Sequence, residues 1–185
     1  MKKLMMIAAM MLAAVTVSAQ EAGQVFLKPM VGATLTNVTK IEGKMKFGEV
    51  AGAELGYMLS DNFGLSVGAL YTMQGEKGKN NVGDFKLEYV NVPILANCYV
   101  APGFALKAGV QFGFMTKAKN SNVDFKEYCN KTDISIPLGA AYEFGDFVID
   151  ARYNFGLSKI VKKDYTDESY KNSVIMLTLG YKIPF

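Results

Sequence analysis

The sequence predicts an all-β fold, an eight-stranded antiparallel up-and-down barrel whose strands cross a membrane. Three observations lead to this prediction. Eight stretches of about ten residues alternate apolar side chains with small or polar ones. The connections between these stretches are alternately short and long, and they contain turn formers rather than helical patterns. Because side chains alternate between the two faces of a strand, each stretch has one apolar face and one small or polar face.

Residues 1–19 have the pattern of a secretory signal peptide. Two lysines form a basic start, Leu4–Val15 is apolar, and small residues suited to cleavage end at Ala19. The apolar run is shorter than the roughly 20 residues of a transmembrane helix, and a buried N-terminal helix is the less favoured alternative. We expect cleavage after Ala19 or one residue later, which leaves residues 20–185 as one barrel domain.

Each predicted strand has its own apolar face. The third strand is the clearest, with apolar residues at every second position from Phe63 to Met73 and only Leu70 as an exception. In chain order the predicted strands are Gln24–Thr36, Phe47–Met58, Phe63–Gly75, Phe85–Val100, Phe104–Lys117, Thr132–Phe144, Phe147–Lys159 and Tyr170–Phe185. From the second strand onward, one apolar-face residue of each is Leu55, Val67, Ile94, Val110, Leu138, Ala151 and Leu177. No charged residue interrupts this face in the middle of a predicted strand.

The connections between the predicted strands alternate in length. The short ones consist of turn formers, at Ser60–Asn62, Ala101–Gly103 and Gly145-Asp146. The longer, polar ones are about Asn37–Lys46, Glu76–Asp84, Ala118–Lys131 and Ile160–Ser169. In an up-and-down sheet this order places every short turn at one end and every long loop at the other, as in bacterial outer-membrane barrels.

The two faces admit two opposite barrels. A soluble barrel of the lipocalin kind would enclose the apolar face around a ligand and expose the charges to water. The polar face is rich in glycine, which suits a narrow and crowded lumen. Aromatic residues lie toward the strand ends of the apolar face, where they could form girdles at the membrane interfaces. These features favour a barrel with its apolar face outward, in lipid.

Charged residues on the polar face are therefore expected in the lumen. The candidates for a lumen charge network are Lys28, Glu54, Lys107, Glu143, Asp150, Arg152 and Lys182. Isolated charges in a narrow lumen are costly, so we expect these residues to form salt bridges. A structural plug is the favoured interpretation of this network, and a proton or ion path is the alternative.

Three segments of the sequence resemble PorT-like outer-membrane β-barrel domains. The segments are Tyr89–Tyr99, Gly56–Leu65 with its Ser60-Asp61-Asn62 turn, and Asp150–Leu157. Asn91 and Asn97 stand where that family often has Glu and Lys, so one charge pair of the family is missing here. The resemblance covers essentially the whole chain after residue 19 and implies an eight-stranded barrel like those of OmpX and OmpA. It does not imply a particular activity.

The composition excludes several kinds of chemistry. The chain has no histidine, which removes a Ser-His-Asp triad and a His-ligated metal site. Without Lys2 and Lys3 the chain has 18 basic residues against 17 acidic ones, so its charge does not indicate nucleic-acid binding. We expect no enzymatic activity and no cofactor. Cys98 and Cys129 are expected at opposite ends of the barrel, too far apart for a disulfide, whose Cα atoms lie within about 7 Å.

The function hypothesis is a non-enzymatic protein of the Gram-negative outer membrane, exported through its signal peptide. Its lumen would be plugged by side chains, and its four long loops would contact a surface partner or mediate adhesion. Its other expected partners are the outer-membrane lipid and the barrel-insertion machinery, which would recognise the C-terminal strand with Phe185 as its insertion signal. Two alternatives stay open, namely a narrow channel for small solutes or ions and a secreted soluble ligand-binding barrel.

Overall fold

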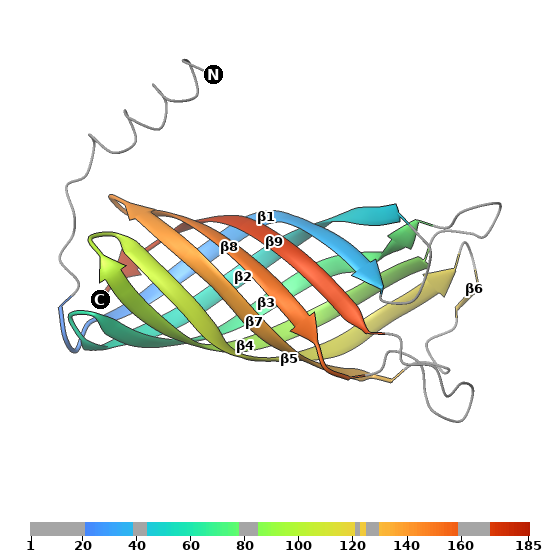
Figure 1. Cartoon of the computed structure of the whole chain (residues 1–185), viewed down its shortest axis with the longest axis horizontal. Coiled ribbons are helices and arrows are strands. Elements are labelled where there is room, and N and C mark those ends of the chain that lie inside the picture. Colours follow the sequence, from blue (N-terminus) through green and yellow to red (C-terminus); the bar gives the residue numbers. More distant parts are fainter. Residues whose placement is uncertain (1–20, 39–43, 78–84, 121–122, 125–129, 159–170) are drawn as a thin grey trace, which may run out of the picture.

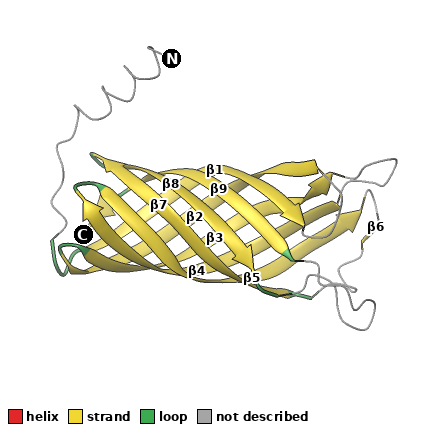
Figure 2. Cartoon of the chain, in the orientation of Figure 1, coloured by secondary structure: helices red, strands yellow, loops and turns green. Residues whose placement is uncertain are grey.

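The computed structural model describes residues 21–38, 44–77, 85–120, 123–124, 130–158 and 171–185. These residues form a closed antiparallel β-barrel of eight long strands, which confirms the predicted fold class (Figures 1 and 2). Among the described residues, no helix is long and apolar enough to span a membrane. The predicted signal peptide lies outside the described residues.

The strands follow one another around the barrel in chain order. The long strands are β1 (Val25–Val38), β2 (Lys44–Ser60), β3 (Phe63–Lys77), β4 (Phe85–Ala101), β5 (Phe104–Asn120), β7 (Thr132–Phe144), β8 (Phe147–Gly156) and β9 (Asn172–Tyr181). The short strand β6 (Val123–Asp124) pairs with β5, and the short strand β10 (Ile183–Pro184) pairs with β1. The antiparallel pairing of β9 with β1 closes the ring.

The strand ends differ from the predicted ones in three ways, the first being that β8 ends at Gly156 and not at the predicted Lys159. At the end opposite the short turns, β2 begins at Lys44 and β5 continues to Asn120, each beyond its predicted limit. Backbone hydrogen bonds do not require apolar side chains, so a ladder can continue after the apolar alternation stops. The last predicted strand is divided at Lys182, where the ladder with β1 is interrupted between the pairs Met30–Gly180 and Leu27–Ile183. Pro29 lies in this gap and has no backbone N–H to donate.

The short turns and the C-terminus lie at one end of the barrel, and the strand ends that lead into the longer connections lie at the other (Figure 1). The turns have the predicted positions, between β2 and β3, between β4 and β5, and between β7 and β8. Gly103 and Gly145 have φ angles of 70° and 58° in these turns, a conformation that glycine adopts without the steric cost of a side chain. The sequence therefore predicted the barrel's polarity.

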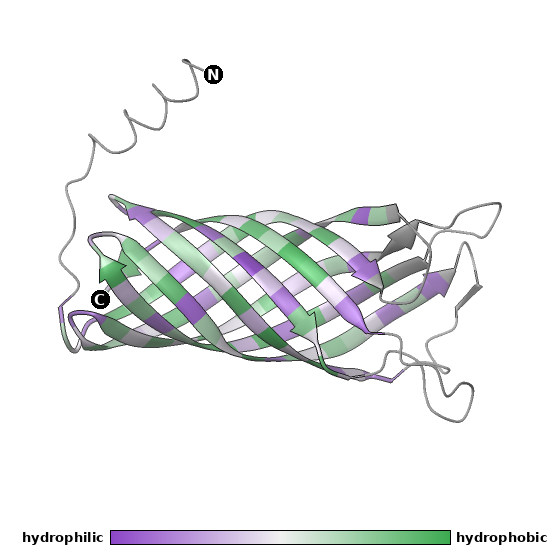
Figure 3. Cartoon of the chain, in the orientation of Figure 1, coloured by the Kyte–Doolittle hydropathy of each residue, from purple (hydrophilic) through white to green (hydrophobic). Residues whose placement is uncertain are grey.

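The apolar face is on the outside of the barrel, as predicted, and apolar and polar residues alternate along the strands (Figure 3). Leu65, Val67 and Leu177 are 44%, 45% and 54% exposed, whereas Glu54 and Asp150 are fully buried. A globular protein in water would not expose this many large apolar side chains, so the surrounding solvent is the hydrocarbon of a membrane.

Leu70, the one exception in the third strand, is explained by its contacts. It is fully buried and packs with Met30, Val50 and Met176 inside the barrel. We call these residues the apolar lumen layer. The residue breaks the alternation in hydropathy, but it keeps the geometric alternation of the strand and points inward.

Cys98 lies on the outer face near the short-turn end, opposite Leu106 of β5 and Phe63 of β3. This is the end expected for it. Cys129 lies outside the described residues, so the absence of a disulfide between the two cysteines stays a prediction.

Candidate functional site in the barrel lumen

Five of the predicted lumen charges meet at one level of the barrel. Lys28 comes from β1, Glu54 from β2, Lys107 from β5, and Asp150 and Arg152 from β8. Each occupies an inward position of its strand, and all five are buried. We call this group the lumen charge cluster.

Asp150 is the centre of the lumen charge cluster. Its Oδ2 atom accepts hydrogen bonds from Lys107 Nζ at 2.6 Å, from Arg152 Nη2 at 2.7 Å and from Lys28 Nζ at 3.4 Å. Its Oδ1 atom accepts from Arg152 Nε at 2.6 Å. Asp150 and Arg152 are two positions apart on β8, so their side chains lie on the same face of the strand.

Glu54 is the second acid of the cluster and contacts the same three cations. Its Oε2 atom lies 2.9 Å from Lys28 Nζ and 3.2 Å from Lys107 Nζ, and its Oε1 atom forms an ion pair with Arg152 Nη2. Three cations thus share two carboxylates in a buried site. Removing one acid would raise the buried excess of positive charge from one to two, and removing one partner of a buried ion pair is strongly destabilising.

The other two predicted charges form a separate pair nearer the short turns. Lys182 Nζ lies 3.0 Å from Glu143 Oε2, and the hydroxyl of Tyr99 donates to Glu143 Oε1 at 2.6 Å. The same ammonium lies 4.7 Å from the ring centroid of Phe26 and 5.6 Å from that of Tyr99, in cation–π geometry. The seven predicted residues therefore belong to two groups rather than to one network.

Sequence reasoning missed two sets of lumen residues. One is the apolar lumen layer, whose members were hidden because apolar inward positions resemble errors in the alternation. The other is the aromatic pair Tyr99 and Phe26 beside Lys182, whereas Asn97 and Asn91, which bind Ser66 (3.1 Å) and Thr72 (2.7 Å), were expected on the polar face. Inward-facing residues occupy every second position of a strand, and this alternation was the signal that could have identified the missed residues.

The space around the lumen charge cluster is small. A cavity of about 10 Å³ lies between Lys28, Glu54 and Lys107 on one side and Tyr99 and Glu143 on the other. This volume holds about one water molecule. Within the described part of the chain, no group of three or more acidic or cysteine side chains is arranged to hold a metal ion. The arrangement joins β1, β2, β5 and β8 across the lumen.

A closed barrel with an apolar outer wall and buried, ion-paired charges inside is a transmembrane β-barrel. The comparison with known families agrees. The chain belongs to the outer membrane protein beta-barrel domain family, whose model matches residues 6–182. Family membership places the protein in the outer membrane of a Gram-negative bacterium. The narrower resemblance to PorT-like domains stays a prediction.

Solved structures of small outer-membrane barrels are similar in fold. The Ail attachment invasion locus protein of Yersinia pestis is 20% identical, with 88% of this chain and 99% of that one covered and a TM-score of 0.56. Neisserial surface protein A is 13% identical, with 86% and 97% covered and a TM-score of 0.56. OprG of Pseudomonas aeruginosa is 16% identical, with 90% and 99% covered and a TM-score of 0.52. No curated protein matches the chain.

Proposed function

We propose that the protein is a non-enzymatic outer-membrane barrel with a closed lumen, which presents its outer connections to a partner at the cell surface. The observation that carries the closed lumen is the lumen charge cluster. Lys28 on β1 and Lys107 on β5 belong to strands on opposite sides of the ring, yet both contact Asp150 on β8. Side chains thus bridge the lumen in more than one direction.

The apolar lumen layer supports the same proposal. Met30, Val50, Leu70 and Met176 come from β1, β2, β3 and β9 and are almost completely buried. A water column through the barrel would have to pass both this layer and the lumen charge cluster. Barrels of eight strands have an interior just wide enough for side chains to fill, which agrees with a plug.

Single-channel recording tests the closed lumen. The purified protein in a planar bilayer should give no stable openings, because ions would have to cross buried ion pairs and an apolar layer. The double variant Leu70→Ala with Met176→Ala provides the control, since it widens the apolar lumen layer and should raise the frequency of openings. Stable openings of the unchanged protein would reject the plug.

A narrow passage is the second candidate function, and one observation favours it. Among the described residues, Arg152 Nη1, Asn154 Oδ1 and Gln74 Oε1 are buried side-chain atoms without a hydrogen-bond partner. Buried polar groups of this kind are usually satisfied by water. A file of such waters would support proton or small-ion movement, and the same recordings distinguish this candidate from the plug.

The surface role rests on the polarity of the barrel, with short turns at one end and longer connections at the other. Replacing residues 159–170 with a glycine-serine linker of equal length should abolish adhesion if this segment contacts the partner, while the barrel still assembles. The same replacement at residues 78–84 provides a matched control. Equal adhesion by the unchanged protein and by a variant with every outer connection replaced would contradict the role. The similarity in fold to the attachment invasion locus protein of Yersinia pestis supports testing adhesion first.

Phe185 is proposed as the mark that the insertion machinery recognises. Its side chain is 75% exposed, and its backbone N–H donates to the carbonyl of Val25 at 2.9 Å. Phe185→Ser should therefore reduce the amount of protein inserted into the outer membrane without unfolding barrel that has already been inserted. Heat-modifiable migration on a gel measures the inserted fraction.

A further inference from the structure

Glu49 places a carboxylate on the outer wall of the barrel. It lies on β2, and its exposed side chain has the same outward orientation as those of Ala51 and Leu55. Its partner across the β1–β2 ladder is the outward-facing Ala33. The acid thus stands on the outward face, which is mainly apolar.

Glu49 lies inside the apolar band rather than beyond it. On the same strand, Phe47 lies farther from the short-turn end of the barrel than Glu49 does, and it is 64% exposed. Leu35, which pairs with Phe47 across the β1–β2 ladder, is 40% exposed. Exposed apolar side chains therefore lie on both sides of Glu49 along the barrel axis, with Phe47 and Leu35 toward the long connections and Val31 toward the short turns. A charge on the lipid face of a barrel destabilises the protein, and an ionisable residue at such a site is a candidate for a function.

The carboxylate of Glu49 has no partner in the described part of the chain, where no residue donates a hydrogen bond to it or forms an ion pair with it. The outward-facing Glu88 of β4 differs. It accepts a hydrogen bond from the hydroxyl of Tyr71 and forms an ion pair with Lys117 at 3.0 Å. Of these two outward acids near the outer end, only Glu49 leaves its charge available to a molecule outside the barrel.

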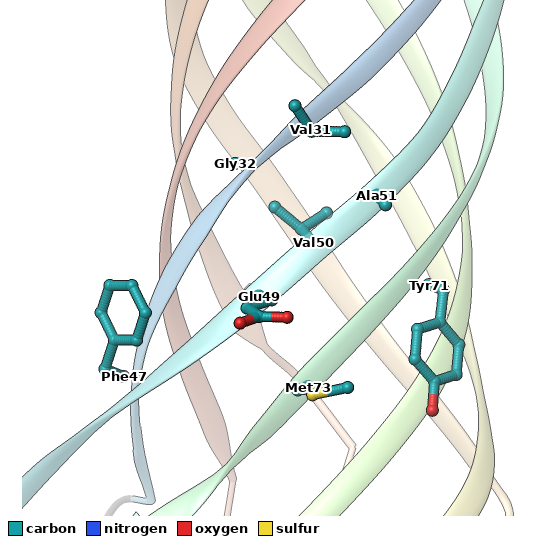
Figure 4. A pocket seen from close by; sticks show the side chains of 8 residues that line it. All are labelled: Val31, Gly32, Phe47, Glu49, Val50, Ala51, Tyr71 and Met73. Carbon is teal, nitrogen blue, oxygen red and sulfur yellow. The ribbon is translucent and has the colours of Figure 1, made fainter.

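An apolar hollow surrounds this carboxylate. The β2–β3 register shifts between Met45 and Val50, and the outer wall beside this irregularity has a hollow of about 480 Å³. Its outward-facing walls are Val31, Phe47, Ala51, Tyr71 and Met73, with Glu49 among them, and Figure 4 shows the carboxylate between Phe47 and Met73. We call this hollow the Glu49 groove. An adjoining hollow of about 270 Å³ shares Phe47, Glu49 and Met73 and extends toward Lys46 and Glu88.

We propose that the Glu49 groove binds a membrane lipid that carries an N–H or O–H donor beside its apolar chain. The chain lies on Phe47, Val31 and Met73, and the donor hydrogen-bonds to the carboxylate of Glu49. An ionised carboxylate only accepts hydrogen bonds, so it recognises an ammonium, an amide N–H or a hydroxyl and repels a bare phosphate. The groove opens on the wall that faces hydrocarbon, so lipid is the molecule that meets it.

Lipid retention measured by native mass spectrometry tests this proposal. The protein is released from bilayers that contain either phosphatidylethanolamine, which has ammonium N–H donors, or phosphatidylcholine, which has none. The unchanged protein should retain the ethanolamine lipid about tenfold more than Glu49→Leu does, because a hydrogen bond to a charged group is lost. Retention of the choline lipid should be equal for the two proteins.

Further variants and lipids make the test specific. Glu49→Gln keeps a hydrogen-bond acceptor without the charge and should retain an intermediate amount. Glu21→Gln removes an exposed acid near the short turns and should behave as the unchanged protein. A ceramide, which has amide and hydroxyl donors but no ammonium, distinguishes the two sources of the donor. Selective retention of either lipid supports the proposal, and the two results assign different donors.

Two results would overturn the proposal. One is equal retention of every lipid by the unchanged protein and by Glu49→Leu. The other is a dimer of the unchanged protein that Glu49→Leu converts to a monomer, which would assign the groove to a second copy of the chain. Neither result bears on the closed lumen, because Glu49 and the lumen charge cluster lie on opposite faces of the wall.

Discussion

Glu54 and Glu49 lie on the same strand, yet their carboxylates have opposite surroundings. An odd number of positions separates them, so Glu54 points into the lumen and Glu49 points outward. Glu54 contacts Lys28, Lys107 and Arg152. Glu49 stands among exposed apolar side chains. The comparison teaches that in a thin-walled barrel one residue of register decides whether a charge stabilises the fold or has to find its partner outside.

The largest expected effect comes from removing an acid from the inner side. Asp150→Asn leaves three buried cations facing Glu54 alone and should lower the free energy of unfolding by about 3 kcal/mol. Urea titration of the protein in lipid vesicles, followed by tyrosine fluorescence, measures this change. Glu21→Gln, the control, should change it by less than about 0.5 kcal/mol. A loss for Asp150→Asn as small as that of the control would mean that the inner acids do not stabilise the fold.

Leucine truncation on the two faces gives a second contrast. Leu70→Ala leaves a gap inside the apolar lumen layer and should cost about 3 kcal/mol. Leu65→Ala removes the same group from the outer wall and should cost about 1 kcal/mol, since lipid chains are as apolar as leucine and fill the space. The same urea titration compares the two variants. Equal losses would mean that the interior of the barrel is not packed.

Arg152→Met should have a smaller effect than Asp150→Asn. The variant loses the ion pairs of the guanidinium, but the remaining Lys28 and Lys107 balance the two carboxylates. We expect a loss of about 2 kcal/mol and a lower midpoint of thermal unfolding. A double-mutant cycle with Glu54→Gln isolates the coupling between the two residues. Unchanged thermal stability of Arg152→Met would argue against the plug.

On the outer side the sign of the effect reverses. In bilayers of phosphatidylcholine alone, Glu49→Leu should raise the free energy of unfolding by about 1 kcal/mol, because it removes a charge from the lipid face. Ethanolamine lipid should reduce this gain, since the unchanged protein then has a donor for its carboxylate. Destabilisation by Glu49→Leu in phosphatidylcholine would show that this acid has an internal role.

The smallest expected effect concerns the outward pair Glu88–Lys117. The side chain of Lys117 is 60% exposed, and exposed ion pairs contribute little because ordering two long side chains offsets their attraction. Lys117→Ala should therefore change the free energy of unfolding by less than about 0.5 kcal/mol. A loss above about 1 kcal/mol would mean that this ion pair stabilises the barrel as strongly as the buried ion pairs of the lumen do.

The sequence predicted the face of each inner charge but not which charges meet. Parity along a strand places Lys28, Glu54, Lys107 and Asp150 in the lumen. It does not give their heights, which depend on how far each strand is staggered against the next. For the same reason the pair Lys182–Glu143 could not be separated from the lumen charge cluster before the register was known.

Glu49 and Leu70 both show what alternation along a single strand cannot predict. Glu49 falls in the second predicted strand on its apolar face, but its position near the strand end gave no reason to place it within the apolar band. Leu70 breaks the alternation in hydropathy because it is part of the apolar lumen layer. Both residues obey the geometric alternation of the strand, and both needed the neighbouring strands to show what their side chains contact.

By itself the sequence determined the fold class, the polarity of the barrel and the face that meets lipid. These properties follow from the period of two along a strand and from the chemistry of turns, and both are local. The tertiary structure alone decided which inward residues bridge the lumen and how deep an outward residue lies in the membrane. Those properties depend on the register between strands that are distant in sequence, because closure of the ring fixes the height of every residue relative to all the others.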